Sequence, residues 1–272
     1  MGRAATGTYV FCLVAAARRP SLEGAPRGPA GMGRVRLIDV DRRLWLAVAG
    51  APLDRYGADA INRGLSHLDW VSRAAIAHEA VVESFVGAQA VAPMKLFTIF
   101  TSDARAVENI TRDRVRVDAA LKRVANHLEW GVRVALDPAQ TPAAKSRRAR
   151  AAPGARSARG AMEALETTSG AAFLTRKKAQ RDANAELAGR AREVVSELYD
   201  RLAAHARVAK RRAPGERPAQ GGPLLLDAAF LVARTRSARF EKAATGAARD
   251  LERHGYRVTV SGPWPPYSFI EE

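Results

Sequence analysis

Few side chains in this 272-residue sequence have the type and spacing that catalysis or metal binding requires. The five histidines are scattered along the chain, at His67, His78, His127, His205 and His254. His78 precedes Glu79, but no histidine follows four residues after it, as the zinc-binding pattern H-E-x-x-H requires. We expect each histidine to lie on a helix surface or at the boundary of an element. The sequence therefore predicts no metal site, no cofactor and no catalytic residue.

The single cysteine, Cys12, lies in a short apolar run and has no base next to it in the sequence. One cysteine excludes a disulfide within the chain and a metal site with several cysteine ligands. We expect Cys12 to be a buried structural thiol. The sequence also lacks the G-x-S-x-G and phosphate-loop motifs, so a binding or structural role is favoured over an enzyme.

Basic residues are concentrated in one part of the chain. The whole sequence has 44 Lys and Arg against 28 Asp and Glu, a net charge of +16. Residues 141–181 contain ten Lys and Arg with only Glu163 and Glu166, so they carry half of that charge. Clustered cations bind nucleic acid by releasing counterions, but Phe173 is the one aromatic side chain available there for base stacking. We favour a solvated basic loop, and nucleic-acid binding by this segment is the alternative function.

The first half of the chain is predicted to form strands followed by helices. Apolar, β-branched runs predict a strand over residues 7–16 and a hairpin from residues 35–40 and 44–49. Helical spacing follows over residues 59–86, with Leu65 and Leu68 on the buried face. An apolar run at 90–100 contains Pro93, which disfavours a central strand there. Ser102 or Asp103 can cap a further helix that runs to about His127.

The second half alternates strands and helices around a basic insertion. We expect strands, helices and the insertion in this order: a strand at 128–136, a flexible Pro-, Ala- and Arg-rich insertion at about 138–160, helix over 161–211, a strand at 224–232, a helix at 236–254 and a strand at 256–260. This order is most of a ferredoxin-like unit. The sequence thus predicts an α+β protein with two domains, residues 1–127 and 128–272. No apolar run is long enough to span a membrane, and we expect a soluble, intracellular protein.

The segment G-P-W-P-P-Y-S-F at residues 262–269 is similar to the C-terminal signature of the GvpL/GvpF family of gas vesicle proteins. Three other segments agree with the family in order and spacing. G-T-Y-V-F-C-L-V resembles its first strand, and L-L-L-D-A-A-F-L-V-A-R resembles its late strand. A-H-E-A-V-V-E-S-F resembles its central helix, and A-P-M-K-L-F-T-I-F resembles the block P-[LM]-[RK]-x-F-[GT]-x-[FL] that follows that helix in the family. Together these segments span nearly the whole chain.

The resemblance implies an accessory protein of gas vesicle assembly rather than an enzyme. It implies two α+β domains, of which the C-terminal one is a modified ferredoxin-like fold with a long helical segment. The partners it implies are the small hydrophobic shell subunit and other gas vesicle accessory proteins, in the cytoplasm and associated with gas vesicles. A role in vesicle nucleation and assembly follows, and nucleic acid is the less favoured partner.

The candidate partner-binding residues are the large apolar and proline residues of the two most specific segments. They are Pro93, Met94, Phe97 and Phe100 in the first segment, and Trp264, Pro266, Tyr267 and Phe269 in the tail. The alternative is that both segments pack into the protein's own core, because exposed apolar patches are uncommon. We favour core packing for most of these side chains, with the tail folded back on the chain.

Overall fold

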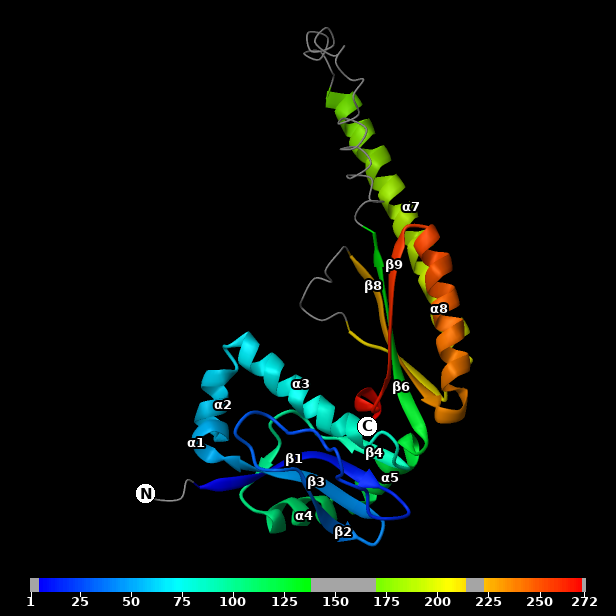
Figure 1. Ribbon diagram of the computed structural model, residues 1–272. Helices are drawn as coiled ribbons and strands as arrows, with labels where there is room; N and C mark the ends of the chain where they lie inside the picture. Colours follow the sequence, from blue (N-terminus) through cyan, green and yellow to red (C-terminus); the bar gives the residue numbers. More distant parts are fainter. Residues whose placement is uncertain (1–4, 138–169, 214–222, 271–272) are drawn as a thin grey trace. The chain divides into compact units, whose positions relative to one another are not determined.

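The computed structural model describes residues 5–137, 170–213 and 223–270 (Figure 1). The predicted insertion at 138–160 and the first part of the predicted helix that follows it lie outside these residues. The described chain forms two compact units. The first comprises Met1–Trp130, Leu231–Ser237 and Gly262–Glu272, and the second comprises Gly131–Phe230 and Ala238–Ser261, in both cases as far as they are described.

The first unit is built on an antiparallel sheet with the strand order β2-β3-β1-β4. Its strands are β1 (Thr6–Ala15), β2 (Arg36–Asp41), β3 (Leu44–Pro52) and β4 (Ala90–Pro93), and β5 (Ile99–Phe100) also pairs with β1. The predicted strand and hairpin are confirmed, with Leu13 opposite Leu46 and Ile38 opposite Leu46 on the other side. Pro93 ends β4, an edge strand of the sheet, where a missing N–H is tolerated.

Helices cover both faces of this sheet. The helices are α1 (Leu53–Tyr56), α2 (Ala58–Gly64), α3 (Leu68–Ser84), α4 (Asp103–Arg112) and α5 (Arg114–Val124). Figure 1 shows α3 on one side of the sheet and α4 on the other. Because strands flank β1 and helices cover it, its residues 7–14 are all buried. A strand buried on both faces is expected to be mostly apolar, as this one is, and the hydroxyl of its buried Thr8 donates a hydrogen bond to Asp103.

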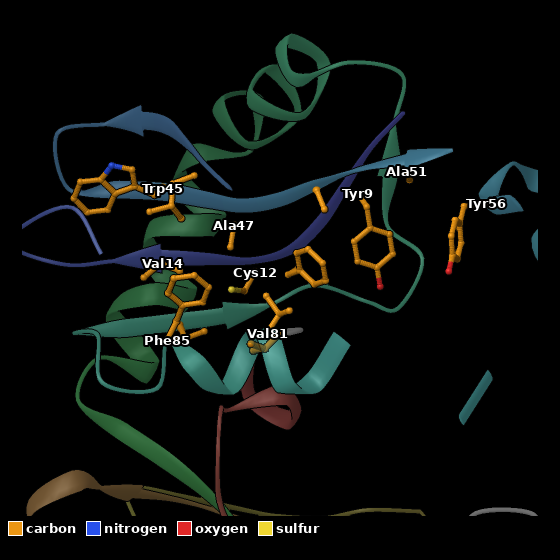
Figure 2. Close-up of a cluster of buried hydrophobic side chains, with 14 residues drawn as sticks. Tyr9, Cys12, Val14, Trp45, Ala47, Ala51, Tyr56, Val81 and Phe85 are labelled. Carbon is orange, nitrogen blue, oxygen red and sulfur yellow. The ribbon is translucent and has the colours of Figure 1, made fainter. Parts of the chain in front are cut away.

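The core of the first unit lies between the sheet and α3 (Figure 2). Cys12 and Val14 of β1 point toward Val81 of α3 and Phe85, the residue that follows α3. Cys12 is fully buried, as the sequence predicted. The loop before β2 also contributes, since a Cβ atom on Gly28 would lie 2.5 Å from the Phe11 ring. Only glycine allows the loop to pack this closely.

Two predictions about the helices of this unit are wrong in detail. The helix predicted over 59–86 is two helices, and Leu65 and Leu68 beside the break are more than half exposed. The break after Gly64, where the His67 N–H bonds to the Gly64 carbonyl, changes the direction of the chain. Apolar residues before and after it therefore do not share a face. The helix predicted from Ser102 to His127 likewise breaks at Asp113, although Ser102 does cap α4 by accepting a hydrogen bond from Arg105 N–H.

The second unit contains a four-stranded sheet in the order β7-β8-β6-β9. Its elements follow one another as β6 (His127–Leu136), α7 (Gly170–Ala203), β7 (Val208–Arg211), β8 (Leu224–Ala233), α8 (Ser237–Arg253) and β9 (Tyr256–Trp264). This β-α-β-β-α-β order is the ferredoxin-like one. The predicted α+β class is confirmed, but the sequence missed β7, which was predicted as the end of the helical segment. Short η3 (Arg234–Arg236) and η4 (Tyr267–Phe269) turns complete the chain.

None of the described helices combines the length and the hydropathy that crossing a membrane requires.

Candidate partner-binding site

The C-terminal tail packs on the first unit, beside strand β4. Pro265 and Pro266 are buried and line a small cavity together with Ala90 and Val91. Arg234 lines the same cavity and donates to the carbonyl groups of Val86 at 2.6 Å and Ala88 at 3.0 Å. Proline has no backbone N–H, so this part of the tail covers the strand without extending the sheet.

Gly262, near the end of β9, adopts a backbone conformation that other residues rarely adopt. Its φ angle is 125°. A Cβ atom at this position would lie 2.8 Å from the Glu129 carbonyl oxygen and 3.2 Å from the Trp130 ring. The first residue of the tail motif is therefore glycine for two independent steric reasons.

A buried carboxylate holds the tail in place. Glu129 of β6 is 5% exposed and accepts two hydrogen bonds from Ser268, one from its backbone N–H and one from its hydroxyl, each 2.7 Å long. Ser268 lies within η4, which is red in Figure 1. The neighbouring Phe269 is fully buried. Tyr267, which precedes Ser268 in the sequence, packs against the core of the first unit.

Beside this tail lies a mostly apolar pocket of about 300 Å³. The apolar residues that line it come from β1, β4, α4, α5 and the tail: Leu13, Ala92, Pro93, Met94, Ile110, Val117, Ala120, Tyr267 and Ile270. The polar residues that line it are Lys95, Thr98, Asn109, Asp113 and Arg116. Lys95, Asp113 and Arg116 are exposed, so the pocket opens to solvent on their side. It can accept an apolar group of a partner and place charged side chains next to it.

The structure brings together three of the eight candidate residues. Pro93 and Met94 from the block after α3 line the pocket with Tyr267 from the tail. We expected the tail to fold back on the chain, and Tyr267 does so by packing against the first unit.

The other five candidates lie elsewhere. Phe97 stacks on Trp70, with ring centroids 5.0 Å apart, and Phe100 pairs with Thr8 in the sheet. Pro266 and Phe269 are buried in the tail contact. Trp264 is 41% exposed, and it does not line the pocket.

Sequence reasoning missed the helical wall of the pocket. Ile110, Val117 and Ala120 lie seven and three residues apart, a spacing that places apolar side chains on one helical face. That signal was present in the sequence. The break at Asp113 divides the face between α4 and α5, so the spacing alone did not indicate that both helices border one pocket.

The histidine prediction is wrong for His78. This residue is 3% exposed, and its Nδ1 lies 2.7 Å from the hydroxyl oxygen of Tyr9. Burial lowers the pKa of His78 to about 4, against a smaller opposing effect of the Met94 backbone, so the ring is neutral at pH 7. Burial likewise raises the pKa of Tyr9 and of Cys12 above their usual ranges. The apolar sequence around His78 gave no indication that a strand would supply its partner.

The tyrosine that borders the pocket is also buried at its polar end. Among the described residues the Tyr267 hydroxyl has no hydrogen-bond partner, and burial raises its pKa. Its ring, rather than its hydroxyl, therefore provides the pocket wall.

Two further predictions concern metal binding and the basic segment. Within the described ranges, no three His, Cys, Asp or Glu side chains come together as possible metal ligands. Residues 141–181 are the basic segment of the nucleic-acid alternative. Of these, residues 141–169 lie outside the described residues, and residues 170–181 belong to α7.

Comparisons with known proteins agree on one family. The sequence matches the family described as gas vesicle synthesis protein GvpL/GvpF over residues 7–271. It is 30% identical over 270 residues to gas vesicle protein L of Streptomyces sp. (strain CB03234), covering 96% of this chain and 91% of that protein.

Two crystal structures have a similar fold. The gas vesicle protein GvpF of Anabaena sp. PCC7120 matches with a TM-score of 0.65 and 15% identity, over 98% of this chain and 97% of that one. GvpF of Microcystis aeruginosa matches with a TM-score of 0.66 and 14% identity, over 98% and 99% of the two chains.

Proposed function

The chain belongs to the GvpL/GvpF family of gas vesicle synthesis proteins, and on that premise we propose that it binds the small hydrophobic shell subunit and assists vesicle nucleation and assembly. In this proposal the protein acts by binding, not by catalysis. It works in the cytoplasm, in association with gas vesicles and with other gas vesicle accessory proteins.

One observation carries this proposal: the two segments that most resemble the family meet at one apolar pocket. Pro93 and Met94 come from one segment and Tyr267 from the other, and the two segments are separated by more than 170 residues in the sequence. A protein that handles an apolar subunit needs a place where apolar side chains of the subunit can leave water. Pockets of this kind hold the anchor side chains that contribute most of the binding energy at protein interfaces.

The proposal is tested by co-expressing the protein with the shell subunit and measuring how much shell subunit co-purifies. Val117 and Val115 supply a matched pair of variants on α5. Val117 lines the pocket, whereas Val115 does not and is 87% exposed. We expect Val117→Lys to reduce the retained shell subunit several-fold and Val115→Lys, which has the same net charge, to leave it unchanged.

Three results would contradict the proposal. The wild-type protein could retain no shell subunit, the two lysine variants could retain it equally, or deletion of the gene could leave vesicle formation unchanged. Thermal unfolding of both variants checks that Val117→Lys remains folded. Flotation of vesicles from lysed cells, followed by detection of the protein in the floating fraction, tests the proposed association with vesicles.

A further inference from the structure

Arg116 differs from the other arginines of α4 and α5 in having no partner among the described residues. Arg105 and Arg112 both bind Glu108, with N···O distances of 2.7 and 3.1 Å. Arg114 binds Asp41 at 2.6 Å and Asp118 at 2.9 Å, and the fifth arginine, Arg123, also makes polar contacts. Arg116 forms no hydrogen bond or ion pair with any described residue.

The Arg116 guanidinium borders the apolar pocket. Lys95 adds a second cation among the lining residues, and Asp113 is the one anion. Asp113 lies at the N-terminus of α5, where the helix dipole stabilises a negative charge, and among the described residues it forms no ion pair with Arg116. The charged residues that line the pocket therefore sum to a positive charge, with Arg116 available for an anion.

We propose that the pocket receives one apolar side chain presented next to a carboxylate, and that Arg116 selects that carboxylate. If the proposed function holds, the occupant is a segment of the shell subunit in which a bulky apolar residue and an acidic residue are neighbours. The inference rests on the proposed function only for the identity of that partner.

The size and the chemistry of the pocket support this occupant. A volume of about 300 Å³ is at the lower limit of ligand pockets, so it accommodates a single side chain with its immediate neighbours. An anchor in the pocket excludes water around it and thereby strengthens an adjacent charge-assisted hydrogen bond. The planar guanidinium of arginine matches the two oxygens of a carboxylate. An apolar anchor and an acidic neighbour are thus recognised together.

Three small probes of the same shape and different charge test the selection on the full-length protein. They are 3-phenylpropionate, 3-phenylpropanol and 3-phenylpropylammonium, titrated at pH 7. The readout is the NMR signal of a ¹³C-methyl label on methionine, because the sequence has only four methionines and Met94 lines the pocket. The Met94→Leu variant identifies the Met94 signal.

We expect 3-phenylpropionate to shift the Met94 signal at a several-fold lower concentration than the cationic probe does. The alcohol should be intermediate. Arg116→Gln should abolish this preference while leaving the response to the alcohol, and Arg105→Gln should keep the preference, because Arg105 is paired and does not line the pocket. Higher salt should reduce the preference in the wild-type protein.

The inference is overturned if no probe shifts Met94, if all three probes act equally, or if Arg116→Gln keeps the preference for the anion. These outcomes do not depend on the shell subunit. If the probes behave as expected but no shell subunit co-purifies, the anion-selective pocket stands and the proposed function fails. If the shell subunit binds but the probes show no preference, the proposed function stands and the anion-selective pocket fails.

Discussion

At the scale of single residues, two buried polar contacts organise the first unit. The Tyr9 hydroxyl meets His78 between β1 and α3, and Glu129 of β6 accepts both hydrogen bonds from Ser268. Each contact joins elements that are far apart in the sequence. A buried polar group without its partner destabilises a fold by more than the bond itself contributes, so both contacts restrict how these elements can pack.

His78 should make the protein sensitive to mild acid. Its pKa is about 4 in the folded state and about 6.5 when unfolded, so the unfolded chain binds more protons between these values. Stability from this residue is complete above about pH 6.5 and is lost as the pH falls toward 4, by up to about 3 kcal/mol. Urea unfolding between pH 4.5 and 7.5 measures this dependence.

Two variants separate this effect from that of other titrating groups. His78→Gln should be less stable at pH 7 but should lose most of the pH dependence in this range. His254→Gln, at the exposed end of α8, should keep it. Equal slopes for the wild-type protein and His78→Gln would show that His78 is not responsible.

Ser268→Ala should loosen the tail. The substitution removes the hydroxyl that bonds to the buried Glu129 side chain, and leaving a buried polar group without its partner costs about 1–3 kcal/mol. We expect a loss of that size in urea unfolding. Ser66→Ala is the control, because the Ser66 hydroxyl makes an exposed bond to the Arg63 carbonyl. Similar losses for both variants would contradict a specific role of the Glu129 contact.

At the scale of elements, the tail completes the first unit. Its two buried prolines cover the edge strand β4, η4 contributes Phe269 to the interior, and Tyr267 forms part of the pocket wall. The motif residues thus have distinct structural tasks: glycine for a positive φ angle, proline for an edge without donors, and aromatic rings for burial. Most of the tail motif is explained by packing, and Tyr267 is the aromatic residue that also reaches the candidate site.

Phe269→Ala and Trp264→Ala should differ, although both remove an aromatic ring from the same tail. Phe269 is fully buried, so its loss should reduce stability by about 3–5 kcal/mol. Trp264 is 41% exposed, and about 1 kcal/mol is expected. Denaturant unfolding of the two variants compares them directly. Equal losses would mean that Trp264 packs more extensively than its exposure indicates.

Gly262→Ala should be destabilising at the start of the tail. The side chain would have to adopt a φ of 125° and would approach the Glu129 carbonyl oxygen, which together should reduce stability by about 1–3 kcal/mol or more. Gly246→Ala is the matched control in α8, where a Cβ atom would meet nothing within 4 Å. That substitution should stabilise the protein by about 0.5–1 kcal/mol. A neutral Gly262→Ala would contradict the steric argument.

At the scale of the whole molecule, the first and the last parts of the described chain belong to the same compact unit. Residues 262–270 belong to the same compact unit as β1 and α3, with the second unit formed by residues between them in the sequence. Our division into domains 1–127 and 128–272 remains a proposal. In this division the tail that completes the first unit belongs to the second domain.

A fragment experiment tests whether the first unit needs the tail. Fragment 1–130 should melt at a lower temperature by itself than with a synthetic peptide of residues 262–270, because the peptide restores the burial of Phe269 and the Ser268–Glu129 contact. A peptide of the same composition in scrambled order should have no effect. Equal stabilisation by both peptides, or by neither, would contradict a specific role of the tail.

The success of sequence prediction varied with how local the governing interactions are. The strand at 7–16, the hairpin and the Ser102 cap follow from neighbouring residues, and the structure contains all three. Strand β7 was missed because V-A-K-R has no apolar alternation, and its pairing with β8 decides its conformation. Leu65 and Leu68 were misplaced because a turn at Gly64 interrupts the helical phase.

The sequence by itself determined the α+β class, most of the strands and helices, and the family, since these depend on local apolar patterns and on motifs read in order. Only the tertiary structure decided that Met94 and Tyr267 border one pocket, that His78 is buried against Tyr9, and that Arg116 has no partner within the part of the chain that the structure describes. The physical reason is that each of these depends on contacts between residues far apart in the chain. Spacing along a sequence does not specify which distant surfaces meet.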